Sequence, residues 1–213
     1  VTGMKVCVIG TGYLAEKNTE LFMDNHTVSI FVPYPLTVEE SVDLRQRTGV
    51  VPIFYNPTKL SAMDLFVVCM DLPYNDIKQH VVMGRFLEVS QAIRRFAHPG
   101  STVIVETKVS VGTTRKYFTG FDVHCSYSPS RVTQDITNTE ITEKSIKLVG
   151  GMDEESEVLA MQFLETIYSN VVRTGSPEVA EAAVMLATAQ ETVQEAMINE
   201  FSDFCDMVGV DVH

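Results

Sequence analysis

The residues with the clearest chemical potential are two glycines near the N-terminus. Gly10 and Gly12 lie in the segment Gly-Thr-Gly-Tyr-Leu-Ala at positions 10–15, after an apolar run and before a helical pattern. In that context a G-x-G-x-x-G/A segment predicts a turn that binds a pyrophosphate with backbone N–H groups at a helix N-terminus. Gly10 allows the tight turn, Gly12 lets the pyrophosphate approach, and Ala15 allows close packing of helix on strand. We predict an ancestral dinucleotide site here; the alternative is that the glycines serve only the turn.

A site of this kind usually has an acidic residue at the end of the second strand, where it binds the adenosine ribose hydroxyls. Here positions 29–34 read Ser-Ile-Phe-Val-Pro-Tyr, with no acid and no nearby Arg or Lys for a 2′-phosphate. Val32 cannot bind the ribose. Glu39 and Glu40 come later and read as a solvated helix face. We therefore expect weak NAD(H) binding at best.

Other candidate site residues follow later strands. The candidate cofactor-binding residues are Gly10, Thr11, Gly12, Tyr13, Leu14, Pro73 and Thr107. Lys108 is a candidate catalytic or phosphate-binding amine, or else an exposed loop lysine, and Arg131 is a candidate contact for an anionic substrate or a neighbouring acid. No nucleophilic triad is visible. The four cysteines lack metal-like spacing and read as buried free thiols of a cytoplasmic protein, so no metal site is expected.

These residues need a scaffold, and the hydrophobic pattern predicts a parallel sheet covered by helices on both faces. Strand-like runs alternate with helical patterns, and several of the runs are apolar throughout. The expected strands are 4–9, 28–32, 50–54, 65–70, 102–105, 121–124, 145–149 and 170–173, and the expected helices are 13–24, 38–46, 75–96, a short one from 112, and 153–168. The fold class is thus α/β, Rossmann-like and doubly wound.

A long helix is expected near the C-terminus. Ser176, Pro177 and Glu178 form a helix start, and Gly209 marks the stop. A helix over 177–208 would be about 45 Å long, too long for this domain to cover. Its main apolar stripe comprises Val179, Ala183, Leu186, Val193, Met197, Phe201, Phe204 and Val208. We expect the domain, residues 1–175, to cover the first part of the stripe, and residues 176–213 to form a homodimer.

The composition limits the classes of partner. The chain has 213 residues, 45% hydrophobic and 21% charged, with a net charge of −12. Such an acidic chain has no general attraction to nucleic acid or to an anionic membrane. No apolar run reaches the roughly 18 residues that span a bilayer.

Together these segments resemble the UDP-glucose/GDP-mannose 6-dehydrogenase family. The matching stretches are 4–13, 105–115, 127–132, 147–151, 180–183 and 198–200, in the family's order. The resemblance covers the NAD-binding domain and the start of the central helix of a typical member. It implies an NAD-dependent oxidoreductase that oxidises a nucleotide sugar and forms a dimer through this helix. The nucleotide-sugar domain, with the nucleophilic Cys, would lie beyond His213.

The chain departs from the family at positions that the resemblance marks as functional. A family Thr corresponds to Lys108, the Glu of a Ser-Pro-Glu motif to Ser130, and the catalytic Lys of the central helix to Gln194. Arg131 is retained. Two readings remain. One is a truncated oxidoreductase-family protein that still binds NAD(H) and needs a further domain for its chemistry. The other is a pseudoenzyme, a non-catalytic dimeric nucleotide-binding or interaction protein on a dehydrogenase scaffold.

Overall fold

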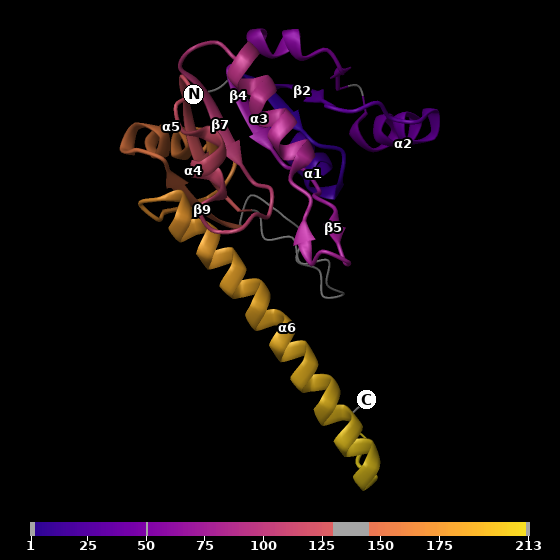
Figure 1. The fold of residues 1–213 in the computed structure, drawn as a ribbon. Helices are drawn as coiled ribbons and strands as arrows, with labels where there is room; N and C mark the ends of the chain where they lie inside the picture. The colour runs from indigo at the N-terminus through magenta and orange to yellow at the C-terminus, as the bar shows by residue number, and fades with distance from the viewer. Residues whose placement is uncertain (1–2, 50, 130–144, 212–213) are drawn as a thin grey trace.

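A computed structural model describes residues 3–49, 51–129 and 145–211. Its main sheet has eight strands in the order β10-β9-β8-β7-β4-β1-β2-β3 (Figure 1). Every neighbouring pair is parallel except β8 with β9. The strands are β1 (Lys5–Ile9), β2 (Thr27–Phe31), β3 (Ile53–Phe54), β4 (Leu65–Val68), β7 (Ser101–Val105), β8 (Val123–Tyr127), β9 (Ile146–Gly151) and β10 (Asn170–Arg173). The predicted doubly wound α/β fold is confirmed.

Helices cover both faces of this sheet. They are α1 (Tyr13–Met23), α2 (Val38–Thr48), the 3-10 helix η1 (Pro57–Ala62), α3 (Gly84–Phe96), α4 (Thr113–Phe118), α5 (Glu154–Leu164) and α6 (Pro177–Val208). One buried cluster joins Phe22 of α1, Leu44 of α2 and Phe163 of α5 to one face of the sheet. A second joins Phe86 of α3 and Phe118 of α4 to the opposite face. Strands buried on both sides must be apolar at every position, which explains their uninterrupted apolar runs.

The helix predicted over 75–96 is wrong in its first half. Residues 74–81 form a hairpin of β5 (Tyr74–Asn75) and β6 (His80–Val81), and α3 begins only at Gly84. The Asn75 side chain accepts a hydrogen bond from the Lys78 N–H, and Gln79 adopts a positive φ of 49°. Both features stabilise a turn rather than a helix. Ile77 is 95% exposed, so the helical spacing that includes it does not mark a buried face.

The long helix α6 has the predicted bounds and caps. The Ser176 side chain accepts a hydrogen bond from the Val179 N–H, and Gly209 ends the helix with a positive φ of 77°. Glu181 is fully buried, and its carboxylate accepts hydrogen bonds from the N–H groups of Gly112 (2.5 Å) and Thr114 (2.8 Å). These bonds attach the beginning of α6 to the N-terminus of α4. Beyond its first turns, α6 projects away from the sheet (Figure 1).

The face of α6 that packs on the domain differs from the predicted one. The sequence predicts that the domain covers Val179 and Leu186, but these side chains are 53% and 70% exposed. The inward face instead carries Ala180, Glu181 and the partly buried Val184. Hydrophobic spacing marks a stripe but does not fix which stripe turns inward, and here the two hydrogen bonds of the Glu181 carboxylate fix it. No helix in the described part of the chain is both long and apolar enough to cross a membrane.

A buried ion pair links the middle of the sheet to α1. Lys147 of β9 donates to Glu106, which follows β7, with 2.6 Å between Nζ and Oε1. The Asn18 amide of α1 donates to the other oxygen of the same carboxylate, also at 2.6 Å. The Lys147 and Glu106 side chains are 2% and 0% exposed, and the Lys147 ammonium lies over the ring of Tyr168. The pair joins three elements that are far apart in the sequence.

Candidate dinucleotide-binding site

The glycine turn lies at the point where the winding of the sheet reverses. The chain passes from β1 outward to β2 and β3, then returns to place β4 on the other side of β1. In open α/β sheets, ligands bind at the carboxyl ends of the strands that flank such a reversal. Gly10 follows β1 directly, with a φ of 148°, and a Cβ there would collide with the Cys69 carbonyl beyond β4. Only glycine fits this close approach.

The first turn of α1 presents free backbone donors at the same place. Gly12 is the N-cap residue of this 11-residue helix and provides no side-chain capping bond. The opening N–H groups of a helix lack partners within the helix, and the helix dipole favours an anion beside them. Thr11 and Gly12 are half-buried, and Tyr13 is 40% exposed. The backbone arrangement therefore suits a pyrophosphate, as the sequence predicts.

One side chain opposes a pyrophosphate at this turn. Asp71 follows β4, and its carboxylate lies against Gly12, so close that a Cβ on Gly12 would collide with it. The Asp71 side chain is exposed, so it has room to move away. A carboxylate beside two phosphate groups nevertheless repels them, since like charges at short range raise the free energy of the complex.

We expect Asp71→Asn to strengthen NADH binding about fivefold, because one unit charge a few ångströms from the pyrophosphate contributes about 1 kcal/mol even at the dielectric constant of water. Calorimetric titration of the variant against the wild type measures the change. Asp76→Asn, in the exposed hairpin turn, is the matched control and should leave the affinity unchanged. Equal affinity of Asp71→Asn and the wild type would show that the carboxylate moves aside at no cost.

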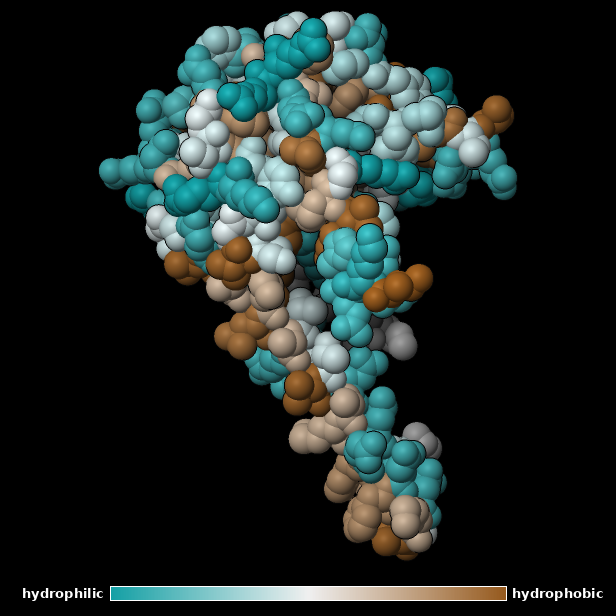
Figure 2. Space-filling model, viewed as in Figure 1, coloured by the Kyte–Doolittle hydropathy of each residue, from teal (hydrophilic) through white to brown (hydrophobic). Residues whose placement is uncertain are grey.

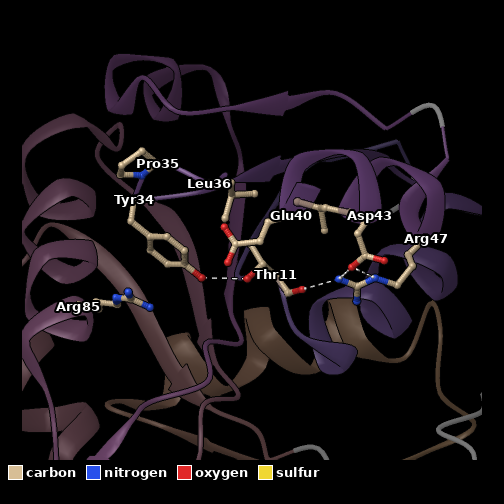
Figure 3. Close-up of a pocket in the computed structure, with 9 residues that line it drawn as sticks. Thr11, Tyr34, Pro35, Leu36, Glu40, Asp43, Arg47 and Arg85 are labelled. Carbon is tan, nitrogen blue, oxygen red and sulfur yellow. Dashed lines mark hydrogen bonds and ion pairs between the residues drawn. The ribbon is translucent and has the colours of Figure 1, made fainter. Parts of the chain in front are cut away.

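Beside the glycine turn is a cavity of about 280 Å³ between the end of β2 and α2. Thr11 contributes from the turn, and its hydroxyl shares a 2.8 Å hydrogen bond with the Tyr34 hydroxyl (Figure 3). The remaining lining residues are Pro35, Leu36, Glu40, Asp43, Leu44, Arg47 and Arg85. In doubly wound sheets the adenosine ribose binds beyond the end of the second strand. This cavity is therefore the candidate site for the adenosine end of a dinucleotide.

Two arginines line this cavity, which corrects the expectation of no nearby Arg or Lys. Arg47 of α2 pairs with Asp43 (2.8 Å) and Glu16 (3.1 Å) and also donates to the Thr11 carbonyl at 3.4 Å. The Arg85 guanidinium, from the start of α3, lies 4.1 Å from the centre of the Tyr34 ring. Arg47 is 36 residues from Thr11, and Arg85 is farther still, so only the tertiary fold brings them to the turn.

Glu40 is held in a fixed orientation within the cavity. Its Oε2 accepts the Thr37 N–H at 2.7 Å, while the Glu40 N–H donates to the Thr37 hydroxyl at 3.1 Å. This reciprocal pair is a capping box at the start of α2. The Thr37 N–H bond, with a smaller contribution from the Arg85 charge, lowers the pKa of Glu40. The carboxylate is therefore ionised at neutral pH. Glu40 is exposed on α2, as the sequence predicts for a solvated helix face, and it also lines this cavity.

The other candidate cofactor residues, Leu14, Thr107 and Pro73, lie in three different environments. Leu14 packs against the buried cluster under α1. The buried Thr107 hydroxyl accepts the Met70 N–H at 2.9 Å and donates to the Val68 carbonyl at 3.1 Å, so it connects the ends of β4 and β7. Pro73 is exposed, and its carbonyl accepts the Val82 N–H beside the hairpin.

The two candidate catalytic positions in the described part of the chain lie on different elements. Lys108 is exposed beyond β7, and Gln194 is exposed in α6. Ser130 and Arg131 lie outside the described residues.

The cysteines do not supply a reactive thiolate to this site. All four are free and buried. Burial raises the pKa of Cys7, Cys69 and Cys125 well above that of an ordinary thiol. Since the thiolate is the nucleophilic form, these three thiols are inert at neutral pH.

The sequence of this chain is similar to those of known nucleotide-sugar dehydrogenases. No family model matches the chain. UDP-N-acetyl-D-mannosamine dehydrogenase of Methanococcus maripaludis is 22% identical over 98% of this chain, and UDP-N-acetyl-D-glucosamine 6-dehydrogenase of Pseudomonas aeruginosa is 25% identical, also over 98%. The chain spans about half the length of these relatives, 53% and 54% respectively.

Solved structures show the same fold. A UDP-D-ManNAc dehydrogenase from Pyrococcus horikoshii superposes with a TM-score of 0.81 at 18% identity, covering 98% of this chain and 56% of that one. A GDP-mannose dehydrogenase from Pseudomonas aeruginosa gives a TM-score of 0.79 at 18% identity, with 98% and 54% covered. Along nearly its whole length, the chain resembles the N-terminal half of the nucleotide-sugar dehydrogenases.

Proposed function

We propose that this chain is the dinucleotide-binding half of a protein of the nucleotide-sugar 6-dehydrogenase type, and that it binds NAD(H) weakly at residues 10–13. The observation that carries the proposal is the glycine turn at the reversal of the sheet, where Gly10 fits tightly and α1 presents its free N–H groups. The backbone forms these contacts, so they persist when side chains change. When bound, NAD supplies a hydride acceptor.

We attribute the weak NAD(H) binding to two side chains. Val32, at the position of the usual ribose acid, is fully buried and apolar. Loss of a charged hydrogen bond costs about 1.5–3 kcal/mol, or roughly one to two decades of affinity. The Asp71 carboxylate beside Gly12 adds repulsion.

The Gly12→Val substitution tests the location of the site. A Cβ at position 12 already collides with the Asp71 carboxylate, and the larger side chain fills the space that a pyrophosphate needs. We expect this variant to lose all measurable NADH binding in a calorimetric titration. Gly84→Ala is the matched control, since an added Cβ there meets nothing within 4 Å. Unchanged NADH affinity in Gly12→Val would place binding elsewhere on the chain.

We propose further that the chemistry of sugar oxidation is not carried by the side chains of this half. The resemblance matches Lys108, Ser130 and Gln194 to functional family positions that hold other residues. NADH formation with UDP-glucose by the purified 213-residue chain, above a no-protein control, would contradict this proposal.

A non-catalytic dimeric protein is the second candidate, and the exposed surface of α6 favours it. Met197, Phe201 and Phe204 are 65%, 61% and 55% exposed. Figure 2 shows apolar side chains along the projecting helix. An apolar surface of this extent is typical of an interface. We propose that two copies pair through 177–208, with 1–175 as the nucleotide domain and 176–213 as the dimerisation segment. The free cysteines fit a reducing compartment, which we propose is the cytoplasm.

A further inference from the structure

The cavity beside the glycine turn contains an acidic group that the second strand lacks. Val32 ends in the core and cannot contact a ligand. Glu40, from the first turn of α2, lines the same cavity as Thr11 of the glycine turn. In Figure 3 its carboxylate points toward the Thr11–Tyr34 hydrogen bond. The negative group is thus supplied by a helix instead of by a strand end.

The Glu40 carboxylate is prepared to accept hydrogen bonds from a ligand. The Thr37 N–H fixes Oε2, and among the described residues no side-chain donor is bonded to Oε1. A ribose diol offers two neighbouring hydroxyl donors, and an ionised carboxylate is the acceptor that suits them. Because the capping box already holds the side chain, little conformational entropy remains to be lost on binding.

The charges around the cavity oppose an extra phosphate group. Arg47 is already compensated by Asp43 and Glu16. Arg85 lies on the Tyr34 ring, and its charge also acts on Glu40. Three carboxylates therefore surround two guanidinium groups. A 2′-phosphate entering here would meet the Glu40 carboxylate, and Arg85 alone would have to balance both charges, because Arg47 is already paired with Asp43 and Glu16.

We infer that Glu40 replaces the missing strand-end acid as the acceptor for the adenosine ribose hydroxyls, and that it makes this cavity selective for NAD(H) over NADP(H). The inference rests on the proposed dinucleotide function and deepens it: Glu40 recovers part of the ribose affinity that is lost at Val32, and the repulsion from Asp71 remains. It assigns the adenosine subsite to the cavity between β2 and α2, and it assigns coenzyme choice to a residue of the α2 capping box.

The test is a set of calorimetric titrations of NADH and NADPH into three proteins: the wild-type chain, Glu40→Gln and Glu39→Gln. Glutamine preserves the capping box, so α2 should remain folded, and circular dichroism verifies this. Glu39→Gln removes the same charge from the adjacent exposed position, which does not line the cavity. Binding is the readout, so no catalytic activity is required.

We expect the wild type to bind NADH at least tenfold more tightly than NADPH. Glu40→Gln should lose about tenfold or more in NADH affinity, the usual effect of losing a charged hydrogen bond. The ratio of NADH affinity to NADPH affinity should therefore be smaller in this variant than in the wild type. Glu39→Gln should match the wild type in its affinity for both coenzymes.

Wild-type NADH affinity in Glu40→Gln would overturn the inference while leaving dinucleotide binding intact. Tighter binding of NADPH than of NADH would also overturn it and would assign the cavity to Arg85 and a 2′-phosphate. If neither NADH nor NADPH binds the wild-type chain, the proposed function is overturned together with the inference.

Discussion

Replacement of Met197 and Phe201 together by aspartate is expected to convert a dimer into monomers. Both side chains lie on the part of α6 that projects beyond the domain, and both are more than half exposed in the single chain. In a symmetric pair of helices, each buried side chain of this size contributes about 1.5–3 kcal/mol, and both copies contribute. Aspartate removes that contribution and adds charges that are costly to bury.

Light scattering at micromolar concentration measures the result. The wild type should have twice the 23.7 kDa chain mass, and the double variant should have the mass of one chain. Thr188→Asp with Asn199→Asp is the matched control, because it adds the same charges at exposed polar positions that, with about 3.6 residues per turn, lie on the opposite face of the same helix from Met197 and Phe201. A wild-type mass near that of one chain would show that α6 does not form a dimer interface.

Lys147→Met should lower the free energy of unfolding by about 3–5 kcal/mol, the usual effect of breaking a buried ion pair. The substitution leaves the Glu106 carboxylate buried without its lysine, while the Asn18 amide still donates to it. Urea denaturation, at a fixed protein concentration because of the proposed dimer, measures the change.

A second variant separates the loss of the ion pair from the loss of lysine packing. Glu106→Gln combined with Lys147→Met removes both charges, so most of the lost stability should return. A change below about 1 kcal/mol in Lys147→Met would mean that water or another group compensates the buried carboxylate.

The fold could be predicted because its central features are local in the sequence. β4 is a run of four buried apolar residues, Leu65–Val68, which is typical of a parallel strand covered on both faces. The caps of α6 at Ser176 and Gly209 are equally local. The sequence pattern does not predict the hairpin at 74–81, because Ile77 and Val81 fit a helical period. The hydrogen bond from the Lys78 N–H to the Asn75 side chain stabilises a turn there instead.

Only part of the site could be predicted, because only the glycine turn is local in the sequence. The glycine turn is a contiguous motif, and its geometry follows from residues 10–15. The adenosine cavity is lined by Thr11, Glu40 and Arg85. These residues come from the glycine turn, α2 and α3, and only the tertiary fold brings them together. Asp71 illustrates the same limit, since its contact with Gly12 exists only because β4 returns beside β1.

Dinucleotide binding at the glycine turn is tested most directly by nuclear magnetic resonance. NADH is titrated into ¹⁵N-labelled 213-residue chain, and the backbone amide signals are followed. We predict saturable shifts at Gly10, Thr11, Gly12 and Tyr13, together with residues that line the adjacent cavity, and no such shifts in Gly12→Val. Amide signals of residues 10–13 that stay unchanged at saturating NADH, or shifts confined to α6, would contradict the proposal.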